Sequence, residues 1–206
     1  MAYIELPSDP IFIDKLKDIY GDIEEHIMEK EGLIVSNDYK FNNHIGDITN
    51  GIRWTWAINH ESFVLFEKCV QGIYKNINKF FRNEFRIFGA SFITLYEKEV
   101  CDSNYHLDIN SHYDKKGITN ALTLIFPLYM EDEMGGLEYK DSGEIRVYKY
   151  KKNRVFVWDA CKLEHRTQPY RLNNKRKRVL VSMIFATNEE WAIRSVENTL
   201  NYQGNI

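Results

Sequence analysis

The chain has 206 residues, of which 44 % are hydrophobic and 28 % are charged, and its net charge is -3. This composition excludes a disordered chain, and the net charge excludes a strongly basic protein that coats nucleic acid by charge alone. No apolar run approaches the roughly 20 residues that cross a bilayer, and the first residues lack the pattern of a secretory signal. We therefore expect one cytoplasmic domain, residues 1–206, without a membrane span.

The three cysteines, Cys69, Cys101 and Cys161, are isolated along the chain and form no CxxC pair. An odd number of scattered cysteines favours reduced thiols, packed as small apolar groups, over a disulfide framework. This interpretation agrees with the expected cytoplasmic location, where thiols stay reduced.

Residues 1–88 are predicted to be mainly helical support. Asp9-Pro10 is a typical helix start, and the helix is expected to stop near Gly32. Its apolar residues recur at alternating gaps of three and four: Ile13, Leu16, Tyr20, Ile23 and Ile27.

A second helix is predicted from about residue 61 to residue 85, capped by Asn59 or Ser62. Its apolar stripe has the same helical spacing and consists of Phe63, Phe66, Val70, Ile73, Ile77 and Phe81. The segment before it is less regular, although residues 52–56 could form a short strand.

The second half of the chain has the pattern of β structure. Strands are predicted at residues 91–96, 121–126, 137–139, 145–150, 155–158 and 179–185. Short strands separated by polar turns favour a sandwich, barrel or jelly roll. We expect an α+β fold in which residues 89–187 form a jelly-roll core, the N-terminal helices cover one sheet face, and residues 188–206 form a closing helix and tail.

The motif His106-Leu107-Asp108 is a candidate for metal binding. Residues two apart on an extended chain project to the same side, so the imidazole and the carboxylate can reach one ion. His165 follows a later predicted strand. Two histidines and one carboxylate form a facial triad, which leaves coordination positions open and is typical of non-heme Fe(II) oxygenases.

Arg178 lies on the last predicted strand, thirteen residues after His165. Its guanidinium presents a fixed fork of donors that pairs bidentately with a carboxylate. A metal with open positions beside such an arginine suits an oxo-acid cosubstrate. HxD alone occurs by chance in many chains, but the order HxD, strands, His, then a strand bearing Arg is much more specific.

In this order the sequence resembles the Fe(II)- and 2-oxoglutarate-dependent oxygenases, in particular their prolyl-4-hydroxylase-like branch. The resemblance covers about residues 92–185. The matching residues are Tyr96, His106-Leu-Asp108, Leu122-Thr-Leu-Ile125, Gly135-Gly136-Leu-Glu-Tyr139, Val155-Phe-Val-Trp158, His165-Arg-Thr-Gln-Pro169 and Arg178-Val-Leu-Val-Ser182-Met-Ile-Phe185.

The resemblance implies a double-stranded β-helix, a cupin-like jelly roll, whose iron is held by His106, Asp108 and His165. It also implies that Arg178 grips the far carboxylate of 2-oxoglutarate, with Tyr96 and Ser182 in the same pocket. The implied reaction consumes dioxygen, decarboxylates 2-oxoglutarate to succinate and hydroxylates a C–H bond of a small molecule or peptidyl residue. Ascorbate is a candidate stimulant.

Two alternative ligand assignments remain open. His112-Tyr-Asp114 is a second HxD and competes with His106 and Asp108 for the metal. Arg176 shares a strand face with Arg178, but it lies in the tract 175–178, whose other members are expected to be solvated. We prefer the first HxD because its spacing after Tyr96 fits the family.

Two alternative functions also remain open. A jelly roll can keep a metal site without turnover, as a binding module. The basic stretches 149–154 and 171–178, with interleaved tyrosines, could instead bind nucleic acid. Solvated strand edges explain those stretches more simply.

Overall fold

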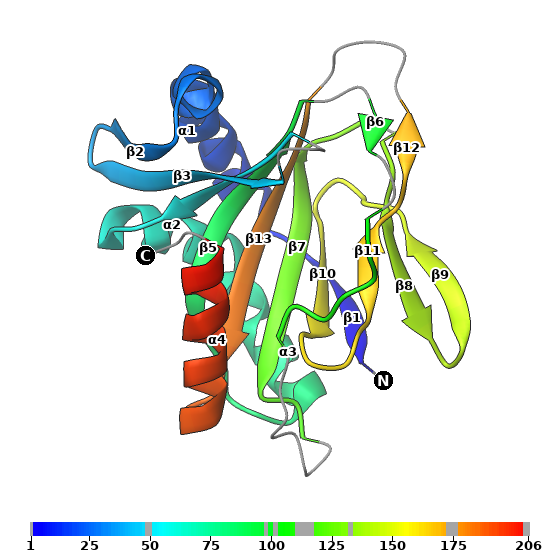
Figure 1. Ribbon diagram of the computed structural model, residues 1–206. Helices are drawn as coiled ribbons and strands as arrows, with labels where there is room; N and C mark the ends of the chain where they lie inside the picture. Colours follow the sequence, from blue (N-terminus) through cyan, green and yellow to red (C-terminus); the bar gives the residue numbers. More distant parts are fainter. Residues whose placement is uncertain are drawn as a thin grey trace.

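The computed structural model describes residues 2–47, 51–96, 99–100, 103–109, 118–131, 134–171 and 177–203. Within these residues the strands form one large antiparallel sheet and two smaller ones (Figure 1). The large sheet has eight strands in the spatial order β1 (Tyr3–Pro7), β10 (Arg154–Asp159), β7 (Ala121–Tyr129), β13 (Arg178–Ala186), β5 (Arg86–Leu95), β4 (Ile52–Ala57), β3 (Tyr39–Asp47) and β2 (Gly32–Ser36). The smaller sheets are β11 (His165–Thr167), β8 (Leu137–Asp141) and β9 (Glu144–Tyr148), and β12 (Tyr170–Arg171) with β6 (Glu99–Val100).

The helices are α1 (Pro10–Glu29), α2 (His60–Val70), the 3-10 turn η1 (Gln71–Ile73), α3 (Tyr74–Phe81) and α4 (Glu190–Tyr202). The predicted N-terminus of α1 is confirmed: the Asp9 side chain accepts a hydrogen bond from the amide of Ile11 at 2.9 Å. The five predicted stripe residues of α1 are all buried. Asn59 and Ser62 together form a capping box at the start of α2.

The two faces of the large sheet have different covers, because successive side chains of a strand alternate between faces. On one face, Val179, Val181, Met183 and Phe185 of β13 pack with α1, α2 and α3 in the main hydrophobic core. On the other face, Leu180 packs with residues of β8 and β9, and the segment near Ile184 packs with α4. The jelly-roll prediction, with the N-terminal helices on one face of the sheet, is confirmed.

Two expectations about the first half need correction. The predicted helix 61–85 is divided into α2, η1 and α3, with Gly72 in the break, and α3 ends where Arg82 adopts a left-handed conformation with φ 57°. Glycine weakens a helix because it loses more backbone freedom than other residues. In addition, β1 and β2 to β4 belong to the large sheet, so residues before 88 contribute strands as well as helices.

Cys69 is buried and Cys161 is half-buried, and neither forms a disulfide, whereas Cys101 lies outside the described residues. Burial raises the pKa of the Cys69 thiol to about 12, which agrees with a packed, unreactive side chain. Among the helices of the described residues, none has the length and apolar character that crossing a membrane requires.

Candidate metal centre

His106, Asp108 and His165 meet at one point between the large sheet and the β11–β8–β9 sheet. One potential ligand atom from each residue lies within 4.8 Å of the other two. Asp108 Oδ1 is 3.5 Å from His165 Nε2 and 3.9 Å from His106 Nε2. The fold thus brings the HxD motif next to His165, more than fifty positions later in the chain, as the sequence predicted.

A single antiparallel bridge brings the two histidines together. The amide of His106 donates to the carbonyl of His165 at 2.9 Å, and the amide of His165 donates to the carbonyl of His106 at 3.0 Å. Residues paired in this way carry their side chains on the same face. The two imidazole rings accordingly lie with their centroids 4.6 Å apart.

Each imidazole is oriented by a main-chain carbonyl two residues before it. Nδ1 of His106 is 3.0 Å from the carbonyl of Asn104, and Nδ1 of His165 is 2.9 Å from the carbonyl of Leu163. A carbonyl only accepts, so each Nδ1 carries the proton and each Nε2 keeps its lone pair. Both lone pairs are therefore available to a metal ion, as in many histidine metal sites.

Asp108 is held in its ionised form. Its Oδ2 accepts hydrogen bonds from the hydroxyl of Thr123 at 2.7 Å and from the indole of Trp158 at 3.0 Å. Burial alone would raise the pKa of Asp108, but His165, Thr123 and His106 together lower it to about 2. Burial in turn opposes the charged form of His165, yet the Asp108 carboxylate raises the pKa of that imidazole. The charge of the site thus suits a cation.

We expect Trp158→Phe to weaken metal binding about tenfold, because outer partners of a ligand typically contribute 10–100-fold in affinity. Phenylalanine keeps a ring beside His165, whose centroid lies 5.0 Å from that of Trp158, but it removes the donor to Asp108. Titration with Co(II), followed by its visible absorption, measures the change. Trp191→Phe, on α4, is the matched control and should bind as the unchanged protein does. Equal affinity in both variants would contradict this role of Trp158.

Arg178 is a buried cation in the same cavity. Its side chain donates to the carbonyl of Gly135 at 2.9 Å, lies 3.5 Å from the hydroxyl of Thr167 and sits over the Tyr170 ring at 5.4 Å. Among the described residues no carboxylate pairs with it, and its Nε is buried without a partner. Burying a charge is costly unless an opposite charge compensates it. A carboxylate ligand would supply the opposite charge that this guanidinium requires.

Gly135 and Gly136 allow the chain to approach this arginine. A Cβ at Gly135 would collide with the carbonyl of Gln168, and one at Gly136 would collide with the carbonyl of Tyr148. The absence of side chains is therefore required for the close approach of these segments.

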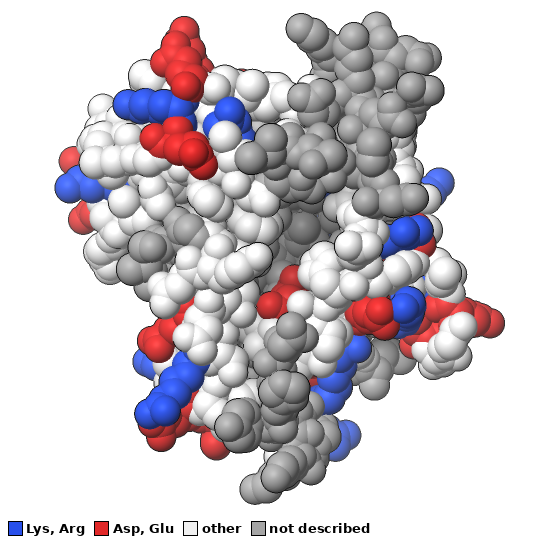
Figure 2. All heavy atoms as spheres, in the orientation of Figure 1, with Lys and Arg blue, Asp and Glu red and all other residues white. Residues whose placement is uncertain are grey.

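One cavity of about 790 Å³ contains the triad and Arg178. Ser182 lines it on the same strand face as Arg178, as expected. Further lining residues come from β4 and α4. Figure 2 shows a hollow near the middle of this face, with acidic atoms in it and mostly uncharged residues around it.

Tyr96 does not line this cavity, and that part of the prediction is corrected. Its hydroxyl donates to Glu24 of α1 at 2.7 Å and is 3.2 Å from the hydroxyl of Tyr20. Ser91 and Ile93 face the cavity, so the alternation of side chains turns Tyr96 toward α1 on the opposite face. The alternative candidates His112, Asp114 and Arg176 lie outside the described residues.

Sequence reasoning missed the role of Trp158 and the position of Tyr150. Tyr150 follows β9 and lines the cavity. Burial raises its pKa to about 12, while the charges of Arg178 and Asp108 act on it in opposite directions. Thr123 lies in the cavity, whereas Thr94 faces Tyr20.

The fold, two facing sheets with this site between them, is similar to that of several solved structures. A prolyl-4-hydroxylase from Pseudomonas putida is similar over 91 % of this chain and 93 % of its own, with 13 % identity and a TM-score of 0.58. EctD from S. alaskensis, with 2-oxoglutarate and 5-hydroxyectoine, is similar over 90 % of this chain and 72 % of its own, at 13 % identity and a TM-score of 0.60.

HygX from Streptomyces hygroscopicus, with nickel, 2-oxoglutarate and hygromycin B bound, is similar over 91 % of this chain and 83 % of its own. Its identity is 9 % and its TM-score 0.55. No protein-family model and no curated protein matches the chain. At these identities the similarity concerns the fold, so the function rests on the residues of the site.

Proposed function

We propose that the protein is an Fe(II)- and 2-oxoglutarate-dependent dioxygenase that hydroxylates a C–H bond of a small molecule or a peptidyl residue. The observation that carries this proposal is that one cavity contains two sites, of which one suits a metal cation and the other suits a carboxylate. One is the histidine and carboxylate triad, whose donor set suits Fe(II) with open positions. The other is Arg178, a buried cation without a carboxylate partner among the described residues.

The residues of the chain would divide the work as follows. His106, Asp108 and His165 hold the iron, and Arg178 pairs with the far carboxylate of 2-oxoglutarate. When bound, iron and the keto acid supply the oxidising chemistry with dioxygen. Apolar side chains of the cavity wall, Ile125 among them, exclude water from the reacting groups.

The remaining cavity wall supports a small substrate without a strong charge. Trp54 and Trp56 of β4 line it, as do neutral polar residues of α4 that include Ser195, Asn198 and Thr199. Among the described lining residues, the only charged or titratable groups beside Tyr150 and Tyr202 are the triad and Arg178. A charged substrate group would therefore lack a counter-charge there. The volume lies within the range of small-molecule sites, about 300–1,000 Å³.

The nucleic-acid alternative is less well supported by the contacts of the basic stretch. Lys151 and Arg154 both pair with Glu5, at 3.0 and 2.8 Å, so their charges are partly compensated within the protein. Lys149 and Lys152 line a neighbouring cavity of about 800 Å³ rather than the triad cavity. Nucleic-acid binding that falls steeply with salt would favour this alternative.

The proposed function is tested by anaerobic titration of metal-free protein with Fe(II) and 2-oxoglutarate. We expect a weak visible charge-transfer band to appear only when both are present, since the keto acid must chelate the metal. Substrate discovery then follows from succinate formation with a panel of small molecules and peptides. A protein that binds Fe(II) but gives no band at saturating 2-oxoglutarate would instead be a metal-binding module.

A further inference from the structure

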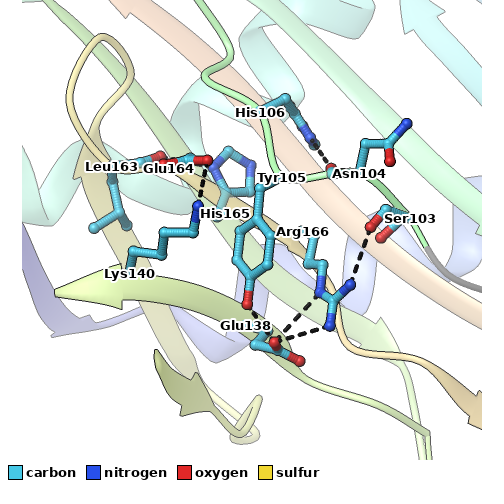
Figure 3. Close-up of polar contacts among 10 residues, drawn as sticks. All are labelled: Ser103, Asn104, Tyr105, His106, Glu138, Lys140, Leu163, Glu164, His165 and Arg166. Carbon is cyan, nitrogen blue, oxygen red and sulfur yellow. Dashed lines mark hydrogen bonds and ion pairs between the residues drawn. The ribbon is translucent and has the colours of Figure 1, made fainter. Parts of the chain in front are cut away.

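The outer side of the two ligand segments carries a polar cluster that the proposed reaction does not use. Tyr105 precedes His106, and Arg166 follows His165. Because side chains alternate, the bridge that puts the two histidines on the inner face puts Tyr105 and Arg166 on the outer face. Figure 3 shows Tyr105 and Arg166 both directed toward Glu138 of β8.

Glu138 joins these two side chains. One of its oxygens, Oε1, accepts hydrogen bonds from the Tyr105 hydroxyl and from Nε and Nη2 of Arg166, the latter two at 3.3 and 3.1 Å. Glu138 is 8 % exposed and lies directly across from Arg166 in the β11–β8 pairing. We call Tyr105, Arg166 and Glu138 the outer clamp. It spans three adjacent chain segments in one row.

Two cations of the small sheet lie over the Tyr105 ring of the outer clamp. The guanidinium of Arg166 lies 4.6 Å from the centre of the Tyr105 ring, and the ammonium of Lys140 lies 4.4 Å from it. Lys140 is itself held by Glu164, the neighbour of His165, at 2.6 Å. Cation–π contacts of this kind add to the hydrogen bonds and fix the ring in place.

The main chain of segment 103–109 is held at two places: by the bridge between His106 and His165, and by the Ile109 amide, which donates to the carbonyl of Ala160 at 3.2 Å. It forms one isolated bridge to β11, rather than a continuous ladder. A slip of one residue in a β pairing turns every side chain to the opposite face. Here a slip would direct Tyr105 toward the metal position and His106 away from it.

We infer that the outer clamp sets the register of the metal ligands, with Tyr105 and Arg166 acting as positioning residues for His106 and His165. This inference rests on the proposed function for its consequence, which is metal affinity. The contacts on which it rests require no metal: the row Tyr105–Arg166–Glu138 on the outer face holds the row His106–His165 on the inner face.

Three variants test the outer clamp: Arg166→Met, Tyr105→Leu and the milder Tyr105→Phe. The first readout is hydrogen exchange of the His106 and His165 amides in metal-free protein, because these amides bond to each other's carbonyls. We expect exchange about tenfold faster in Arg166→Met and Tyr105→Leu, the size expected on losing hydrogen bonds to a charged group. Tyr105→Phe keeps the ring and should show a smaller increase.

The second readout is the Co(II) dissociation constant, expected to rise about tenfold or more in the same two variants. Arg146→Met is the matched control, because Arg146 pairs with Asp141 at 3.2 Å on the same small sheet but does not contact the ligand segment. It should change neither readout, and its melting temperature in metal-free protein should match that of the unchanged protein.

The outcomes separate the two proposals. If exchange and Co(II) affinity in Arg166→Met and Tyr105→Leu match those of Arg146→Met, the outer clamp does not set the register and the inference is overturned. If the unchanged protein binds no metal, the proposed function fails, and the exchange rates alone still decide on the outer clamp. If Arg166→Met does not fold, a faster exchange in Tyr105→Phe supports the inference and an unchanged rate overturns it.

Discussion

Asp108→Ala should abolish the charge-transfer band and weaken metal binding by more than about a hundredfold, since loss of an outer partner alone typically costs 10–100-fold. The substitution removes the carboxylate of the triad and leaves the two imidazoles. It also leaves the Thr123 hydroxyl and the Trp158 indole without their shared acceptor. Each unpaired buried donor costs about 1–3 kcal/mol, so the melting temperature should fall as well.

The controls for this variant separate loss of a ligand from general damage. Asp141→Ala removes a carboxylate of β8 that bonds to Tyr3 and Arg146, and it should leave Fe(II) binding and the band unchanged. His112→Ala tests the second HxD motif directly. If His112→Ala loses the band while Asp108→Ala keeps it, the metal is bound by the alternative pair and the present ligand assignment is wrong.

Arg178→Leu should keep Fe(II) affinity but lose most of its affinity for 2-oxoglutarate. Truncating one partner of a buried charge pair costs about 2–5 kcal/mol, which corresponds to roughly 30-fold to several-thousand-fold in the dissociation constant. No described carboxylate is left unpaired by the change, because the described partners of Arg178 are neutral, the carbonyl of Gly135 and the hydroxyl of Thr167. The metal-free variant should therefore fold as the unchanged protein does.

The measurement is the 2-oxoglutarate dependence of the band at saturating Fe(II), together with the thermal shift that the cosubstrate produces. Binding to the folded state raises the melting temperature, so 2-oxoglutarate should stabilise the unchanged protein and not Arg178→Leu. Arg154→Leu is a suitable control, because Arg154 pairs with Glu5 at 2.8 Å away from the cavity. An Arg178→Leu protein with unchanged 2-oxoglutarate affinity would show that another cation binds the cosubstrate.

Features that depend on neighbouring residues could be predicted from the sequence. The cap and stripe of α1 are set by spacings of a few residues, and the structure has them as expected. Strand β1 was missed because its partner β10 lies about 150 positions later in the chain. The β2–β3 hairpin was missed because its turn depends on Asn37, whose φ of 53° is unusual for a residue other than glycine.

The residues of the candidate site that are recognised by their chemical type could be predicted from the sequence. The strand face on which a side chain lies could not. His106, Asp108 and His165 carry the chemistry of a metal site, and the fold brings them together. Tyr96 was assigned by its distance along the chain from His106, which does not tell on which face of β5 it lies. Trp158 and Thr123 are directly paired across β10 and β7 and both point at Asp108, a relation that only the register reveals.

The hydrogen bonds of Asp108 also fix its denticity. Oδ2 is occupied by two donors, so only Oδ1 faces the two imidazole Nε2 atoms. If the proposed metal is bound, a carboxylate restrained in this way would be a monodentate ligand, and the three residues would supply three donor atoms rather than four. For an octahedral ion this difference decides whether a bidentate keto acid leaves room for a further small ligand. By occupying Oδ2, Thr123 and Trp158 would thereby keep one coordination position of the proposed metal open without contacting the metal.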